Sequence, residues 1–188
     1  MPTTIRQLIF EHYGTTVDEL CKLFKVEKEE LLVSYVNGQL KFFHNQFFSF
    51  ITLLKKHIRL VKPTRILEWG PGQSTNFMLR ECPDAEIICI ESDQRWFNKY
   101  NKEFGHKVSL FHYPDWDIYT NPPVEGPFEI IFVDGHKRVR CMQTAVKLLS
   151  KDGVLVLHDG HREEYKPGIA LFDTIEESHQ TICLKQKS

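Results

Sequence analysis

The chain has 188 residues, of which 41% are hydrophobic and 26% charged, and its formal net charge is −1 at pH 7. This length predicts one domain with a small appendage, and the near-zero charge argues against nucleic-acid and acidic-membrane partners. No run of about 18 apolar residues and no leader pattern stands out, so we expect a cytoplasmic protein without a membrane span. The five scattered cysteines form no CxxC pair, which is typical of reduced thiols.

Residues 1–60 carry helical periodicity, and we expect them to form an N-terminal helical cap. Thr16 and Glu19 have the spacing of a capping box at the start of a first helix. A second helix is expected over residues 29–36, ended by the Asn-Gly pair that follows. An aromatic-rich third helix is expected to run from residue 42 and to end before Pro63. The first two helices also have the spacing of a DNA-binding motif. The second is acidic and would repel phosphates, so a cap that packs on the main domain is the preferred interpretation.

From residue 64 the pattern alternates between strands and helices, which is typical of a parallel sheet covered on both faces. The expected strands are Arg65–Glu68, Glu86–Glu91, Lys107–Phe111, Phe128–Asp134 and Gly153–His158. The expected helices are Ser74–Arg80, Gln94–Phe104, Val139–Leu149 and about Gly168–Ser178. The fold class is therefore α/β, and we predict a Rossmann-like three-layer α/β/α sandwich over residues 61–188.

Acidic residues stand at the ends of four expected strands, where ligands bind in such sheets. They are Glu68, Glu91, Asp134 and Asp159. Glu91 follows Gly72 by 19 residues, a spacing at which a carboxylate can accept the two hydroxyl groups of a ribose. Gly70 and Gly72 allow a ligand to approach the backbone closely. The sequence thus predicts a nucleotide-sized site at the carboxyl edge of the sheet.

Three motifs resemble the class I S-adenosylmethionine-dependent methyltransferases, over about residues 60 to 185. Glu68-Trp69-Gly70-Pro71-Gly72-Gln73-Ser74 is similar to the E/D-x-G-x-G-x-S cofactor loop of that family, and Ile90-Glu91-Ser92-Asp93 to its ribose-binding segment. Residues 148–159 are similar to its fifth-strand segment. The resemblance implies S-adenosylmethionine as cofactor, held by Glu68, Gly70, Gly72, Ser74, Glu91, Ser92, Tyr113, Asp115, Trp116 and Asp134.

The choice between cofactors follows from charge and from one glycine. Thr75 stands where a dinucleotide-binding loop has its third glycine, and a sulfonium cofactor brings no phosphates. A cationic methyl donor is attracted electrostatically by carboxylates. S-adenosylmethionine is therefore preferred to NAD(P). A Rossmann oxidoreductase and a non-catalytic, cofactor-binding regulatory domain remain as alternatives.

The segment Phe132-Val133-Asp134-Gly135-His136-Lys137 resembles small-molecule O-methyltransferases of the catechol and antibiotic or sugar types. That resemblance implies a small-molecule hydroxyl as the substrate, Asp134 and Asp159 as Mg²⁺ ligands, and Lys137 as general base. Gly160 replaces an expected asparagine ligand, so Mg²⁺ is only a candidate cofactor. Without a metal, His136 is the better base, because an imidazole takes up a proton near neutral pH.

The carboxyl-terminal edge of the expected sheet is short of strands. After the fifth strand this fold normally has a helix and two antiparallel strands, whereas only Thr181–Lys185 reads as a strand. Either the fold is cut short, the sheet is shortened, or a second chain covers the edge and makes a homo-oligomer.

Overall fold

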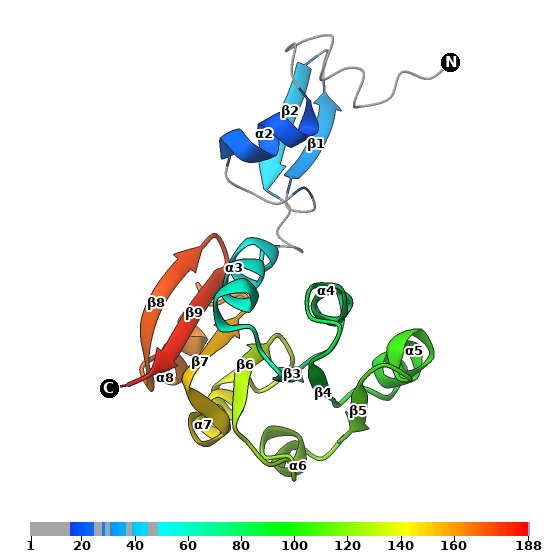
Figure 1. Ribbon diagram of the computed structural model, residues 1–188, viewed down its shortest axis with the longest axis vertical. Helices are drawn as coiled ribbons and strands as arrows, with labels where there is room; N and C mark the ends of the chain where they lie inside the picture. The colour runs from blue at the N-terminus through cyan, green and yellow to red at the C-terminus, as the bar shows by residue number, and fades with distance from the viewer. Residues whose placement is uncertain (1–15, 25–27, 29–30, 37–38, 45–48, 188) are drawn as a thin grey trace. The chain divides into compact units, whose positions relative to one another are not determined.

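The computed structural model describes residues 16–24, 28, 31–36, 39–44 and 49–187 (Figure 1). The chain divides into two compact units, Met1–Thr52 and Leu53–Ser188. None of the helices in the described ranges is long and apolar enough to cross a membrane.

The first unit contains one helix and a two-stranded sheet. Helix α2 (Val17–Phe24) begins after Thr16, whose amide donates to Glu19 Oε2 at 2.8 Å while the Glu19 amide donates to Thr16 Oγ1 at 3.2 Å. This reciprocal pair confirms the predicted capping box. Strands β1 (Leu31–Val36) and β2 (Gln39–His44) pair antiparallel, with Val36 opposite Gln39.

The helical prediction is therefore wrong over residues 31–36 and 42–44, which belong to these two strands. The sequence of β1, Leu-Leu-Val-Ser-Tyr-Val, is rich in β-branched and aromatic residues, and an Asn-Gly pair between two such runs is a strong hairpin signal. Of the predicted third helix, Phe42 and Phe43 belong to β2, and Phe47 and Phe48 lie outside the described residues. Its later part, which was expected to end before Pro63, is confirmed as α3 (Ile51–Val61).

The second unit is built on a seven-stranded sheet. Its strands are β3 (Arg65–Trp69), β4 (Glu86–Glu91), β5 (Ser109–His112), β6 (Phe128–Val133), β7 (Leu149–Leu157), β8 (Phe172–Ser178) and β9 (Thr181–Gln186). The spatial order is β5-β4-β3-β6-β7-β9-β8, and β9 pairs antiparallel with both of its neighbours. The other strand pairs are parallel.

Helices cover both faces of this sheet. The helices are α4 (Gln73–Glu81), α5 (Gln94–Phe104), α6 (Trp116–Thr120), α7 (Arg138–Leu148) and α8 (Lys166–Ile169), with the 3₁₀ turn η3 (Glu163–Tyr165) before the last. In Figure 1, α3 and α4 lie on one side of the sheet, and α6 and α7 lie on the other. Apolar residues of β3, β6 and β7 are fully buried, as expected of strands covered on both faces. The predicted Rossmann-like sandwich is confirmed.

The prediction for the carboxyl-terminal edge is wrong in one respect. Residues 172–178 form β8 rather than a helix, so the sheet keeps its two antiparallel strands and is not shortened. In β8 only Phe172 is buried, because this strand lies at the edge of the sheet and carries charged side chains. An edge strand with one buried residue has little apolar alternation, and this is why the strand signal was weak.

Candidate functional site

The glycine turn after β3 packs directly on the turn after β6. Gly70 has a φ of +84°, and a Cβ atom there would lie 2.5 Å from the Gly135 amide nitrogen. The Gly70 amide donates to Ile90 O at 3.0 Å, and the Asp134 amide donates to Trp69 O at 2.9 Å. These contacts hold the carboxyl ends of β3, β4 and β6 together. Glycine is required at Gly70, because the conformation is left-handed and the space is filled.

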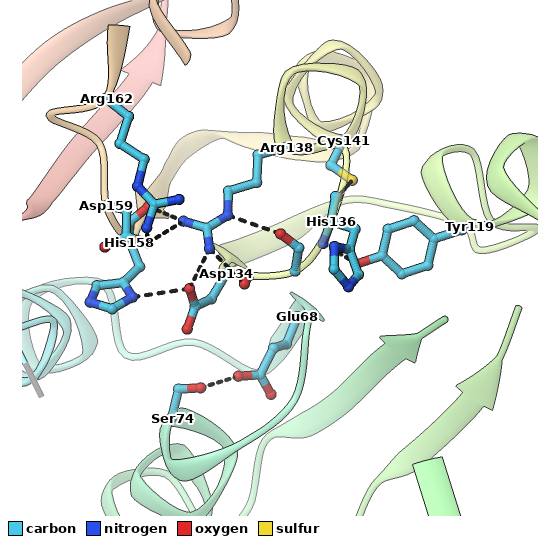
Figure 2. A network of polar contacts seen from close by, with 11 residues as sticks. Glu68, Ser74, Tyr119, Asp134, His136, Arg138, Cys141, His158, Asp159 and Arg162 are labelled. Carbon is cyan, nitrogen blue, oxygen red and sulfur yellow. Dashed lines mark hydrogen bonds and ion pairs between the residues drawn. The ribbon is translucent and has the colours of Figure 1, made fainter. Parts of the chain in front are cut away.

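Beneath this turn lies a fully buried carboxylate, Glu68. Its two oxygens accept hydrogen bonds from Ser74 Oγ and from Thr75 Oγ1, the second at 2.6 Å, and Figure 2 shows the bond from Ser74. The Gly72 amide donates to Thr75 Oγ1 at 2.9 Å. Burial raises the pKa of Glu68 from 4.5 to about 7, against the hydrogen bonds from the two hydroxyl groups. Glu68 and Ser74 thus fix the shape of the turn from below.

At the end of β4, Glu91 and Ser92 are both nearly buried, with 6% and 9% of their surfaces exposed. Glu91 Oε1 accepts from the amides of Ser92 at 2.6 Å and of Asp93 at 2.8 Å. Burial raises the pKa of Glu91, and the two amide bonds oppose the shift. Ser92 Oγ is buried and has no hydrogen-bond partner within the described part of the chain. A buried hydroxyl without a partner is costly, so a polar ligand group is expected beside it.

The residues after β5 lie beside Glu91, whose carbonyl accepts from the Tyr113 amide at 2.8 Å. Asp115 caps α6 through Oδ1, which accepts from the Asp117 amide at 2.9 Å and the Ile118 amide at 3.1 Å. Tyr113 is half-buried and stacks on Phe111 at a centroid distance of 5.9 Å. Asp115 therefore has a structural task at the helix start, while Tyr113 presents an aromatic ring.

Trp116, His136 and Lys137 gather at an exposed rim. Trp116 is 41% exposed, and its ring meets the His136 ring edge-on at a centroid distance of 5.7 Å. Lys137 Nζ lies 5.3 Å from the centre of the Trp116 ring. The His136 amide donates to the Tyr119 hydroxyl at 3.1 Å, which fixes the backbone at this point. The two predicted base candidates are thus brought together next to an aromatic surface.

Asp134 and Asp159 lie on either side of a buried arginine, Arg138 (Figure 2). Arg138 Nη2 donates to Asp134 Oδ1 at 2.9 Å, and Nη1 donates to Asp159 Oδ2 at 3.3 Å. Asp159 also pairs with Arg162 at 2.8 Å, and its φ of 55° is left-handed, which is uncommon outside glycine. His158 Nδ1 lies 3.0 Å from Asp134 Oδ1. Burial favours neutral His158, but the hydrogen bond and charge of Asp134 outweigh it and raise the pKa of the imidazole.

Asp134, His158 and Asp159 offer ligand atoms that lie within 4.8 Å of one another, which is the spacing of a metal site. One oxygen of each carboxylate, Oδ1 of Asp134 and Oδ2 of Asp159, is bound to the Arg138 guanidinium, however. A protonated guanidinium repels a divalent cation and fills its place. The residues present do not fit the predicted Mg²⁺ site.

Two residues that shape this edge of the sheet were not predicted from the sequence. Arg138 follows Asp134 by four residues and begins α7, so the spacing from a strand-end acid to the first helical residue was the available signal. Tyr119 is fully buried under the rim, and its carbonyl accepts from Trp69 Nε1 at 2.8 Å. No sequence pattern pointed to Tyr119, because its hydrogen-bond partners, Trp69 and His136, are distant from it in the sequence.

The chain matches no protein-family model, and no curated protein matches its sequence. Solved structures do match. A protein from Klebsiella pneumoniae, assigned as an O-methyltransferase, is 15% identical with a TM-score of 0.60, and the match covers 98% of this chain and 96% of that one. A protein from Staphylococcus aureus, assigned as a caffeoyl-CoA O-methyltransferase, is 14% identical with a TM-score of 0.59, over 95% of this chain and 96% of that one.

A third solved structure is the SAH-bound methyltransferase PaMTH1 of Podospora anserina. It is 20% identical with a TM-score of 0.58, over 73% of this chain and 78% of that one. At such identities the likeness establishes a shared Rossmann-like fold.

Proposed function

We propose that this chain is an S-adenosylmethionine-dependent methyltransferase that methylates a hydroxyl group of a small molecule. The observation that carries the proposal is the pair Glu91 and Ser92 beside the glycine turn. It combines a carboxylate with a buried hydroxyl that has no partner, at the edge of the sheet where ligands bind. The matching solved structures of nearly the same length, assigned as O-methyltransferases, support the proposal.

The described residues fit the nucleoside half of this cofactor. Glu91 accepts the ribose hydroxyl groups, and Ser92 Oγ gains the partner that it lacks in the free chain. A Cβ atom on Gly72 would have Tyr100 Oη as its nearest neighbour, at 3.4 Å, so this glycine leaves room above the turn. Tyr113 offers an aromatic face to the adenine. S-adenosylmethionine would supply an electrophilic methyl group on a sulfonium sulfur.

A dinucleotide suits the same turn less well. Thr75 stands at the third glycine position, is fully buried, and uses its hydroxyl group to hold Glu68 and the Gly72 amide. Glu68 and Glu91 place two carboxylates near the turn, where a pyrophosphate would be repelled and a sulfonium attracted.

On the acceptor side, His136 takes the proton of the substrate hydroxyl. It is exposed at the rim, and Trp116 next to it offers an aromatic surface on which a small ring can lie. Lys137 lies above the same indole ring and orients an electronegative group of the substrate. The net charge of −1 disfavours nucleic acid, so the acceptor is proposed to be a small molecule.

Calorimetric titration with S-adenosylhomocysteine tests the proposal. Glu91→Gln is expected to weaken binding at least about tenfold, because it removes a charge-assisted hydrogen bond. Glu86→Gln makes the same change at the exposed, opposite end of β4 and is expected to leave the affinity unchanged. Absence of binding by the unaltered chain, or binding of NADH instead, would refute the proposal.

A further inference from the structure

Arg138 occupies the position between Asp134 and Asp159 that a divalent cation would need. Its Nη2 and Nη1 atoms lie 2.9 Å from Asp134 Oδ1 and 3.3 Å from Asp159 Oδ2. Mg²⁺ needs oxygen ligands at about 2.0–2.1 Å, so an ion shared by these two oxygens would lie against the guanidinium.

Three further hydrogen bonds hold Arg138 in this place. Nε donates to Gly135 O at 2.9 Å, Nη1 to His158 O at 2.5 Å, and Nη2 to Asp134 O at 2.9 Å. With the two bonds to carboxylates, the number of bonds equals the five N–H donors of a guanidinium. The side chain is only 9% exposed and its guanidinium carbon lies 5.1 Å from the centre of the Tyr165 ring. Moving Arg138 aside would break these three hydrogen bonds to backbone carbonyl groups.

The charges of the cluster are already balanced. Arg162 Nη2 lies 2.8 Å from Asp159 Oδ2, so two arginines stand against two aspartates. A dication is drawn to a surplus of carboxylates, and these four side chains carry none.

We propose that Arg138 is a permanent, built-in substitute for a metal ion, so that the site works without a divalent cation. Arg138 is a positioning residue: it fixes the Asp134 carboxylate at the end of β6, beside the glycine turn. Its meaning for methyl transfer rests on the proposed function, whereas the exclusion of metal is a property of the cluster alone.

The experiment measures Mn²⁺ binding by electron paramagnetic resonance, in which only the free ion gives a strong signal. The unaltered chain is expected to leave Mn²⁺ free at millimolar concentration. Arg138→Met, of similar volume and without charge, is expected to bind Mn²⁺ at least tenfold more tightly. Arg140→Met is the matched control, because Arg140 lies on the same helix and pairs with the exposed Asp117. Arg138→Lys keeps the charge and is expected to exclude Mn²⁺ as the unaltered chain does.

Two results would overturn the inference. One is a single Mn²⁺ bound by the unaltered chain and lost in Asp159→Asn. The other is a folded Arg138→Met chain that binds no more Mn²⁺ than Arg140→Met. Where circular dichroism shows that Arg138→Met does not fold, the unaltered and Arg138→Lys chains decide the question.

A parallel titration with S-adenosylhomocysteine separates this inference from the proposed function. Binding in the presence of a chelator supports both. If S-adenosylhomocysteine binds neither with nor without Mn²⁺, the proposed function is refuted. The inference about Arg138 is then decided by the Mn²⁺-binding measurements alone. Binding that needs Mn²⁺ overturns the inference and keeps the proposed function.

Discussion

Replacing Glu68 with glutamine tests whether the carboxylate under the glycine turn is held at a thermodynamic cost. Burial raises the pKa of Glu68 from 4.5 to about 7. At about 1.4 kcal/mol per pKa unit, the ionised group disfavours the folded state by about 3 kcal/mol. The folded chain binds the proton more tightly than the unfolded chain. Protonation of Glu68 therefore favours the folded state. This stabilising contribution is fully present below pH 4.5 and is lost as the pH rises through 7.

The assay is urea unfolding at a series of pH values, followed by tryptophan fluorescence. All three tryptophans, Trp69, Trp96 and Trp116, belong to the second unit, so the signal reports the unit that contains Glu68. Between pH 5 and pH 8 the unaltered chain is expected to lose roughly 2.5 kcal/mol more unfolding free energy than Glu68→Gln. Glu125→Gln, at an exposed position outside the sheet, provides the reference. Parallel curves for the unaltered chain and Glu68→Gln would refute the reasoning.

Three further predictions concern the turn, the base and the cofactor charge. Gly70→Ala is expected to destabilise the chain by about 2 kcal/mol or more in urea unfolding, because φ at this position is +84° and the added Cβ would meet Gly135. Gly72→Ala should leave the unfolding free energy unchanged and lower the affinity for S-adenosylhomocysteine. His136→Gln should lower kcat with unchanged S-adenosylhomocysteine affinity, and an unchanged kcat would exclude His136 as base. Binding of S-adenosylmethionine at pH 7 should release protons, because the positive charge of this ligand favours the ionised form of Glu68. The number of protons released is measured by calorimetry in two buffers. Equal proton release on binding of the uncharged-sulfur analogue S-adenosylhomocysteine would contradict this prediction.

The parallel core of the sheet was predictable because its strands are buried on both faces. Runs such as Ile130–Val133 and Val154–Leu157 are continuously apolar, and the structure buries all of them fully. Where a strand of the sheet is exposed to solvent, the apolar pattern in its sequence is weaker. β8 has one buried residue and was predicted to be helical. The hairpin β1–β2 was missed for another reason: in a sequence, an Asn-Gly pair is compatible with the end of a helix as well as with a connection between two strands.

The site was predictable as a set of strand ends but not as a set of contacts. Parallel strands bring Glu68, Glu91 and Asp134 to one edge whatever their neighbours are, so position in the sequence was sufficient. The partner of each acid depends on helices and turns whose orientation the sequence pattern does not give. Arg138 illustrates this limit: the motif around Asp134 implied a metal, and one residue at the start of α7 supplies a cation instead.

The acids at this edge differ in how they are stabilised, and the difference separates the two sides of the site. Asp134 and Asp159 are paired with arginines, so their charges are already compensated. Glu68 and Glu91 accept hydrogen bonds from hydroxyl groups and amides, and burial raises both pKa values. A carboxylate whose ionised form is disfavoured gains most from a nearby cation, since their attraction is strongest where water is excluded. The charge distribution alone thus favours a cationic ligand on the side of β3 and β4, which is where a sulfonium cofactor would bind.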